Sequence, residues 1–435
     1  MAKPAPTSLN SDVLSYQANH LHIQDVKVEE LAKKFPTPFF VYSQKALLTN
    51  FHEFLGEAQM AGLEKPLVCF ALKSNPNREL VKLLAQEGSG ADIVSGGELR
   101  RALEAGIAPE KIVFSGVGKT ADEIALALDA GPEGIYSFNV ESLEELELIE
   151  AIAAEKKKTA RICFRLNPMV KAKTHKYIST GNKTHKFGIL AKDVLKAAKD
   201  KKHWKHARLV GLSVHIGSQL LDLKATKTAI EVMGALATKL PQQPEFLDVG
   251  GGLGVAYHPD ELKKLPATAD YMSTVAKALE ASYYSKFRSR PATRVVFEPG
   301  RRIVAKAGFF VMRVLRRKIS EDQRFVIVDG GMNDFMRPSL YDAYHGLVPA
   351  RRSTSTKKYP THVVGPICET SDCFAHHRPL PDLKAQDLLV LCDTGAYGHS
   401  MASNYNLRGK PAEVLITGES EIRLINPAQR YEELR

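Results

Sequence analysis

Short apolar runs alternate with amphipathic stretches over residues 66–301. The runs have the length of strands, and turn-forming residues end them. The stretches between them place apolar residues at helical spacing, as Leu80 and Leu84 do in ELVKLLAQE. The strand candidates are PLVCFALK (from Pro66), ADIVS (from Ala91), KIVFSG (from Lys111), IYSFNV (from Ile135), RICFRLN (from Arg161), LVGLSVHIG (from Leu209), FLDVGGG (from Phe246) and RVVFEPGR (from Arg294). Eight strands alternating with helices predict an α/β fold, a parallel (β/α)8 barrel with its active site at the C-terminal strand ends.

Polar residues mark where helices begin. Ser95 with Glu98, and Thr120 with Glu123, have the spacing of a capping box, in which each side chain caps the backbone near the other. They predict helix starts directly after two of the strands.

A different pattern surrounds this region. After Arg301 the helical spacing stops, and apolar runs such as GFFVMRVL, RFVIVDG, THVVGPIC, DLLVLCD and AEVLITG are separated by turn residues. Ahead of the barrel the sequence predicts a helix at Val28–Lys34 and a strand in TPFFVY, from Thr37. We expect three regions: a barrel over 45–295, a second, mainly β domain over 296–435 with 28–44 contributing, and an N-terminal extension over 1–27.

Composition and charge limit the classes of protein to which this chain can belong. The 435 residues are 44% apolar and 25% charged, as in a globular protein with a sizeable core. The net charge is +11, but the lysines are dispersed along the chain and no nucleic-acid-binding pattern accompanies them. We therefore expect the lysines to lie on solvated helix faces, and we expect no nucleic-acid partner. MAKPAPTSLN lacks the apolar core of a signal peptide, and no run approaches the roughly 18 apolar residues of a membrane span. A cytoplasmic protein with no membrane partner is expected.

The cysteines do not indicate a disulfide framework. Five of them are scattered along the chain. Cys368, Cys373, His376 and His377 are close in sequence but lack the paired ligand spacing of zinc sites, and there is no HExxH. No metal is expected.

Lys73 has the position of a reactive amine, because it ends the first apolar run, and partial desolvation there makes a lysine nucleophilic. The simpler alternative is an ordinary strand-end lysine that reaches solvent. The glycine-rich segment 248–254 ends the seventh run and could bind an anion through its backbone, or could be only a tight turn. Glu298 and Arg301 leave the eighth run together. A lysine, a phosphate-binding glycine loop and a strand-end carboxylate are the groups that hold pyridoxal 5'-phosphate (PLP).

The order of motifs carries a stronger signal than any single motif. The resemblance described next covers roughly residues 28–425. This part of the chain contains, in order, the motifs FALKSN, GADIVSGGEL, KIVFSGVGKT, HKYISTG with KFGI, HIGSQ, DVGGGLG, EPGR, MRPSLYDAYH, CETSD and GAYGHSMASNYN. In these motifs the chain resembles the PLP-dependent decarboxylases of fold type III, and among them those that act on meso-diaminopimelate. The resemblance implies decarboxylation of meso-2,6-diaminopimelate to L-lysine and carbon dioxide, the last step of lysine biosynthesis.

The resemblance also assigns roles around the cofactor. Lys73 would be the Schiff-base lysine, His215 would stack on the cofactor ring, and Glu298 would meet the pyridine nitrogen. Tyr397 would contact the cofactor and the substrate. The phosphate and the substrate entrance would be surrounded by Ser218, Gly252, Gly300 and Arg301.

For the substrate, the resemblance implies that the distal carboxylate is held by Arg301, Arg337 and Tyr341. Glu369 would bind the distal amino group, and Cys368 would donate the proton. In this family the last two residues enter the active site of the partner subunit, so a homodimer is implied.

Alternatives remain for the roles of single residues and for the function of the protein. Cys368 could be a small buried residue, His215 a core histidine, and Arg337 and Tyr341 could simply share a helical face. The substrate could be ornithine, lysine, arginine or carboxynorspermidine, although none of the first three has a distal carboxylate for Arg337. A non-catalytic PLP-binding regulatory homologue is a further alternative, against which the retention of Lys73, Glu298 and Cys368 argues.

Overall fold

The computed structural model describes residues 9, 11–170, 186–200, 203–321 and 323–434. The chain divides into two compact units. One unit, here called the barrel unit, comprises Phe51–Val255 and Lys264–Arg302; the other, here called the sheet unit, comprises Met1–Asn50, Ala256–Lys263 and Ile303–Arg435. Within the described residues, no helix is long and apolar enough to cross a membrane.

In the barrel unit, the described residues form a closed barrel of eight parallel strands, in the order β10-β11-β12-β5-β6-β7-β8-β9. Each predicted apolar run overlaps one of the strands, so the predicted fold class is confirmed. The strands are β5 (Leu67–Ala71), β6 (Gly90–Ile93), β7 (Ile112–Phe114), β8 (Ser137–Val140), β9 (Ala160–Arg165), β10 (Ala207–Ser213), β11 (Phe246–Asp248) and β12 (Arg294–Phe297).

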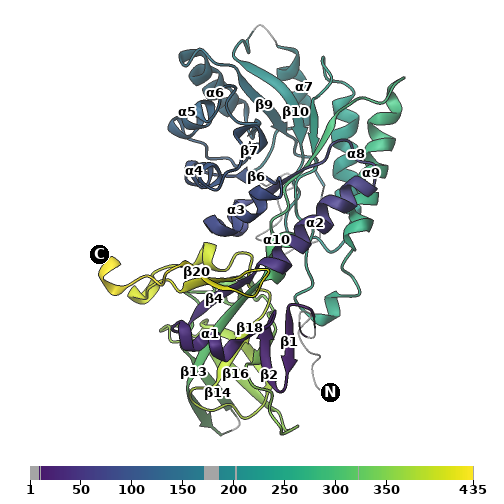
Figure 1. Cartoon of the computed structure of the whole chain (residues 1–435). Coiled ribbons are helices and arrows are strands. Elements are labelled where there is room, and N and C mark those ends of the chain that lie inside the picture. Colours follow the sequence, from purple (N-terminus) through teal and green to yellow (C-terminus); the bar gives the residue numbers. More distant parts are fainter. Residues whose placement is uncertain (1–8, 10, 171–185, 201–202, 322, 435) are drawn as a thin grey trace. The chain divides into compact units, whose positions relative to one another are not determined.

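Helices follow the strands and lie outside them (Figure 1). The Ser95 hydroxyl accepts the Glu98 N–H at 3.2 Å, and Thr120 and Glu123 form the complete capping box, so both predicted helix starts are confirmed. The helices are α3 (Arg78–Gln86), α4 (Gly96–Glu104), α5 (Ala121–Asp129), α6 (Leu143–Glu155), α7 (Ala191–Lys199), α8 (Lys224–Ala237) and α9 (Thr268–Ser282); α2 (Gln44–Met60) and α10 (Arg301–Val304) each have residues in both units.

The barrel interior is filled by side chains from several strands. Phe246 is fully buried in a cluster with Val113, Tyr136 and Val296. A Cβ atom at Gly211 would lie 2.6 Å from the Phe246 ring, so β10 needs a glycine where this ring crosses it. Phe246 therefore sets the spacing between β10 and β11.

The sheet unit is mainly β, as predicted. Its described residues form a nine-stranded mixed sheet, in which β17-β16-β14-β13-β4-β19-β20 run in order and β18 pairs with β13 and β15, and a separate sheet of β1, β2 and β3. The sequence did not predict β1 to β3, β15, β17 or β20. The strands are β1 (Leu14–Gln17), β2 (His20–Ile23), β3 (Val26–Lys27), β4 (Phe39–Ser43), β13 (Gly308–Ser320), β14 (Gln323–Val328), β15 (Leu347–Pro349), β16 (Tyr359–Val364), β17 (Cys373–Leu380), β18 (Leu388–Leu391), β19 (Ala412–Ile416) and β20 (Ile422–Asn426), and the helices are α1 (Val28–Lys34) and α11 (Arg337–Tyr341).

The helix predicted at Val28–Lys34 is α1, with the same bounds. Strand β4 lies within the large sheet, where it pairs with β13 and β19. Its apolar side chains join residues of β1, β2 and β13 in one buried cluster. Residues ahead of the barrel thus supply both a sheet strand and part of the core of the sheet unit.

Phe246→Ala is expected to lower the free energy of unfolding by about 3–5 kcal/mol, because it leaves a cavity against Gly211 that the closed barrel cannot fill. Urea denaturation followed by circular dichroism measures the change. Met60→Ala is the control, since this side chain is 74% exposed. Equal stability of the two variants would contradict the central packing role of Phe246.

Candidate active site

Lys73 lies in the short helical turn that follows β5. Its ammonium group is 2.6 Å from Oδ2 of Asp92, which belongs to the neighbouring strand β6. Asp92 is fully buried, and its other oxygen, Oδ1, has no hydrogen-bond partner among the described residues. A buried oxygen without a partner costs free energy, so the lysine stands beside an acceptor that a ligand can satisfy.

Four strand ends contribute to a buried polar network around Glu298. Its Oε1 accepts hydrogen bonds from the Ser115 hydroxyl at 3.2 Å and the Asn139 amide at 3.1 Å. The same amide is 3.4 Å from Oδ2 of Asp248. We call Glu298, Asp248 and Asp92 the carboxyl cluster.

Burial and mutual repulsion change the ionisation of this cluster. Burial, reinforced by the charges of Asp248 and Asp92, raises the pKa of Glu298 well above its usual value. Burial also raises the pKa of Asp248 to about 6. Two neighbouring carboxyl groups that cannot both ionise share a proton. The cluster therefore holds a proton at a place where a cationic donor could replace it.

A carboxyl cluster that holds a proton in this way suits the pyridine nitrogen of PLP. Of the three carboxyl groups, Asp92 contacts the Lys73 ammonium group, and a protonated pyridine nitrogen would bring a further positive charge and a hydrogen-bond donor to the cluster. The residues present thus fit the group that the sequence implied.

His215 follows β10 and is held in one tautomer. The Gly251 N–H donates to its Nδ1 at 3.1 Å, so the ring proton belongs on Nε2. Desolvation, with Arg165 and Lys73 nearby, lowers the pKa of His215 well below its usual value. The imidazole is therefore a neutral, oriented ring, as a stacking partner requires.

The glycine turn after β11 packs against a second loop. Gly252 has a φ of 101°, and a Cβ atom there would collide with the carbonyl oxygen of Gly217. The next residue of that loop, Ser218, has its hydroxyl 3.1 Å from Nη2 and 3.3 Å from Nε of Arg301. A guanidinium group, a hydroxyl group and a glycine turn form a donor set that suits a phosphate.

Gly300, between β12 and α10, packs closely against the end of β5 and the turn that follows it. A Cβ atom there would lie 2.8 Å from the Ser74 hydroxyl oxygen, and the Ala71 N–H donates to the Pro299 carbonyl oxygen at 3.1 Å. The residues around Glu298 and those around Lys73 are therefore joined through the backbone.

In the sheet unit, Arg337 begins α11 and is buried. Its guanidinium carbon lies 4.9 Å from the ring centre of Tyr257 and 5.9 Å from that of Tyr341. Arg337 and Tyr341 thus share a helix, as the alternative reading allowed. Nε of Arg337 donates to Nε2 of His345 at 3.3 Å, and Nδ1 of that histidine donates to the Cys392 carbonyl oxygen at 2.9 Å.

The CETSD segment forms a tight loop around Asp372, whose carboxylate accepts the N–H groups of Met332 at 2.7 Å and Ile367 at 2.6 Å. This arrangement leaves Cys368 and Glu369 exposed. Hydrogen bonds from Tyr405 and Ser371 lower the pKa of the Glu369 carboxyl. Glu369 is therefore an exposed, oriented anion.

The candidate residues fall into two groups. The barrel unit carries Lys73, His215, Ser218, Gly252, Glu298, Gly300 and Arg301 at the strand ends. The sheet unit carries Arg337, Tyr341, Cys368, Glu369 and Tyr397, the last in a loop after β18 with a φ of 55°. Sequence reasoning did not assign roles to Asp92, His345 or Tyr405. All three stand within the ordered motifs, in GADIVSGGEL, MRPSLYDAYH and GAYGHSMASNYN, but their residue types alone do not indicate these contacts.

Comparisons with known proteins agree with this geometry. Residues 51–305 match the family model of the pyridoxal-dependent decarboxylases, pyridoxal binding domain. Diaminopimelate decarboxylase of Zymomonas mobilis is 40% identical over 417 residues, 95% of each chain. That of Neisseria meningitidis serogroup A is 42% identical over 416 residues, 95% of this chain and 97% of the relative.

Solved structures give the same result. Diaminopimelate decarboxylase of Helicobacter pylori, complexed with L-lysine, has a TM-score of 0.85 and 42% identity over 93% of this chain and 98% of its own. That of M. jannaschii, in co-complex with L-lysine, has a TM-score of 0.90 and 35% identity over 98% and 97%.

Fold, carboxyl cluster and family match together define a PLP-dependent decarboxylase with a (β/α)8 barrel. Within that class, the chain belongs to the diaminopimelate decarboxylase family.

The raised pKa of Asp248 predicts a pH-dependent contribution to stability in the cofactor-free protein. Between about pH 4 and about pH 6 the folded state keeps a proton that the unfolded state has lost, so this contribution falls as pH rises. The stability of the unmodified protein relative to Asp248→Asn should therefore fall across this window, by roughly 3 kcal/mol at most. Urea denaturation at several pH values measures it. Asp222→Asn, at an exposed aspartate, is the control, and parallel profiles for all three proteins would contradict the assignment.

Proposed function

We propose that this chain decarboxylates meso-2,6-diaminopimelate to L-lysine and carbon dioxide, the last step of lysine biosynthesis. The observation that carries the proposal is about 40% identity to diaminopimelate decarboxylases over 95% of the chain. The barrel unit supports it, because the strand ends that hold cofactors in barrel enzymes carry a lysine, a carboxyl cluster and a phosphate-type donor set.

The residues of the barrel unit divide the cofactor between them. Lys73 would hold the aldehyde carbon, Glu298 the pyridine nitrogen and His215 one face of the ring. The phosphate would be held by Ser218, Gly252, Gly300 and Arg301. Tyr397 would contact the cofactor and the substrate. When bound, PLP supplies an electron sink for the charge left by the departing carboxylate.

Binding of the substrate needs one cation and one anion for its distal end. Arg337 would bind the distal carboxylate, and its orientation by His345 and Tyr257 suits a fixed ionic contact. Arg301 and Tyr341 would contribute to the same contact. Glu369 would bind the distal ammonium group, because it is an exposed carboxylate that hydrogen bonds from Tyr405 and Ser371 orient.

Cys368 would donate the proton that replaces the lost carboxylate. Its N–H lies 3.4 Å from the Asn406 side-chain oxygen, so the backbone of the loop is held while the side chain faces outward. Cys368 and Glu369 are both exposed on the single chain, which is expected of residues that complete the active site of another subunit. We therefore propose a homodimer with shared active sites. A cytoplasmic location stays a prediction.

Purified protein with added PLP should release lysine and carbon dioxide from meso-diaminopimelate. Lys73→Ala should reduce both to background, because it removes the amine that holds the cofactor. Lys65→Ala, at a lysine with a 69% exposed side chain, should retain full activity. Ornithine, lysine and arginine are tested in parallel. Turnover of one of these without turnover of diaminopimelate would refute the proposed roles of Arg337 and Glu369.

A mixing experiment tests the shared active sites. Lys73→Ala and Cys368→Ala should each have little activity alone. If the two residues meet across a dimer interface, exchange of subunits in an equal mixture should restore about a quarter of wild-type activity, because half of the dimers then contain one intact site. The double variant Lys73→Ala/Cys368→Ala, mixed with either single variant, is the control. No recovery in the first mixture, after exchange is verified by differently tagged subunits, would contradict the proposal.

A further inference from the structure

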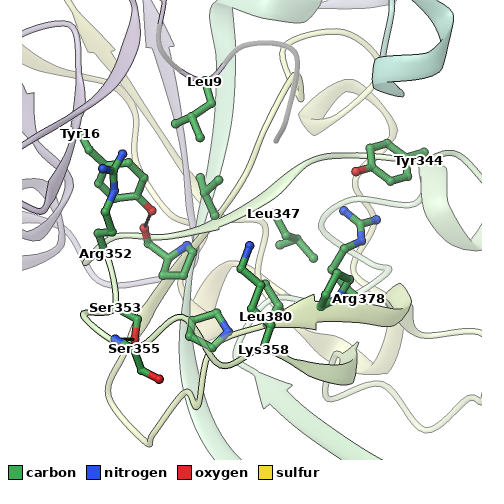
Figure 2. A pocket seen from close by; sticks show the side chains of 14 residues that line it. Leu9, Tyr16, Tyr344, Leu347, Arg352, Ser353, Ser355, Lys358, Arg378 and Leu380 are labelled. Carbon is green, nitrogen blue, oxygen red and sulfur yellow. Dashed lines mark hydrogen bonds between the residues drawn. The ribbon is translucent and has the colours of Figure 1, made fainter. Parts of the chain in front are cut away.

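A pocket of about 430 Å³ lies within the sheet unit (Figure 2). Its walls come from β1, from β15 with the segments on either side of it, and from the end of β17. Among the described residues that line it are Tyr16, Tyr344, Arg352, Lys358 and Arg378. The pocket contains none of the candidate active-site residues, so it needs an explanation of its own.

The charge of this pocket is of one sign. Arg352, Lys358 and Arg378 line it, and no aspartate or glutamate is among its lining residues. None of the three cations forms an ion pair with a carboxylate in the part of the chain that the structure describes. Arg378 is only 8% exposed. A buried guanidinium group without a counter-ion is costly, so the pocket favours an anion.

Two arginines in the pocket are held on aromatic rings. The guanidinium carbon of Arg352 lies 4.5 Å from the ring centre of Tyr16, and that of Arg378 lies 4.1 Å from the ring centre of Tyr344. Figure 2 shows these two pairs on opposite sides, with Lys358 between them. Planar guanidinium groups held in this way suit carboxylate or phosphate oxygens.

The remaining wall is largely apolar. Leucine and proline side chains line it, and its volume is within the range of small-molecule sites. They are Leu9, Leu347, Pro349, Pro379, Leu380 and Pro381. An apolar wall beside three cations suits a ligand that has both an anionic group and an apolar body.

We propose that this pocket binds a small organic anion, a carboxylate or phosphate monoester with an apolar body, and that binding changes the affinity of the active site for its substrate. The coupling follows a short series of contacts. Nη1 of Arg378 donates to the His345 carbonyl oxygen at 3.0 Å, and the ring of that histidine accepts from Nε of Arg337 at 3.3 Å. An anion that draws Arg378 towards the pocket therefore acts on the residue that orients Arg337. This second part rests on the proposed substrate role of Arg337.

Calorimetric titration of the PLP-loaded enzyme tests the binding site without any measurement of activity. Phenyl phosphate and benzoate are the probes, and inorganic phosphate tests the need for an apolar body. Phenyl phosphate or benzoate should saturate one site per chain, and Arg352→Gln/Lys358→Gln should weaken that binding about tenfold. Lys357→Gln is the matched control, because this neighbouring lysine lies over the Tyr359 ring and does not line the pocket.

No saturable binding of either organic probe, or equal affinity in the double variant, would overturn the site. Tighter binding of inorganic phosphate than of phenyl phosphate would overturn the choice of an organic anion.

Steady-state kinetics test the coupling. Saturating phenyl phosphate should change KM for diaminopimelate by about twofold or more in the wild type, with a smaller effect on kcat. The double variant should show no such change, and the Lys357→Gln enzyme should behave as the wild type. An equal KM effect in the double variant would show competition at the active site and overturn the coupling, as would binding without any change in KM.

Discussion

The carboxyl cluster at the strand ends is the constraint on which the barrel site depends. Glu298 and Asp248 come from adjacent strands, and Ser115 and Asn139 from β7 and β8 join them in one buried network. Their burial makes full ionisation unfavourable, and the carboxyl group of Asp92 adds to the negative potential. A closed barrel is needed to bring these groups together, because they lie far apart in sequence. The fold thus creates a place that attracts a protonated heterocycle.

The sheet unit depends on orientation rather than on unusual ionisation. His345 orients the guanidinium group of Arg337 through a hydrogen bond. The Asp372 carboxylate holds the backbone of the loop that contains Cys368 and Glu369. These supporting residues do no chemistry themselves. They limit the conformations of flexible side chains, which lowers the cost of ordering them when a substrate binds. The same His345 connects Arg337 to Arg378, so an orienting residue can also transmit a signal.

The sequence predicts the barrel well because its strands are continuous apolar runs between amphipathic helices, a pattern that two-sided burial produces. It fails for β17, whose CFAHHRPL contains two histidines and a proline. It also fails for β1 (LSYQ) and β2 (HLHI), which contain polar residues and form no continuous apolar run. Ordered motifs identify the residues that would do chemistry. Their supporting partners, such as Asp92 and His345, stand inside these motifs, but their residue types alone do not reveal a role, and their importance emerges only from the distances that the fold creates.

The protonation state of the pyridine nitrogen in the PLP-loaded enzyme tests the role of the carboxyl cluster most directly. The 15N chemical shift of ring-labelled PLP reports it in the wild type and in Glu298→Gln, which keeps the shape of the side chain but cannot become an anion. A protonated nitrogen at neutral pH in the wild type, lost in the variant, is the predicted result. An unprotonated nitrogen in the wild type, or the same shift in both proteins, would contradict the pairing of Glu298 with the cofactor.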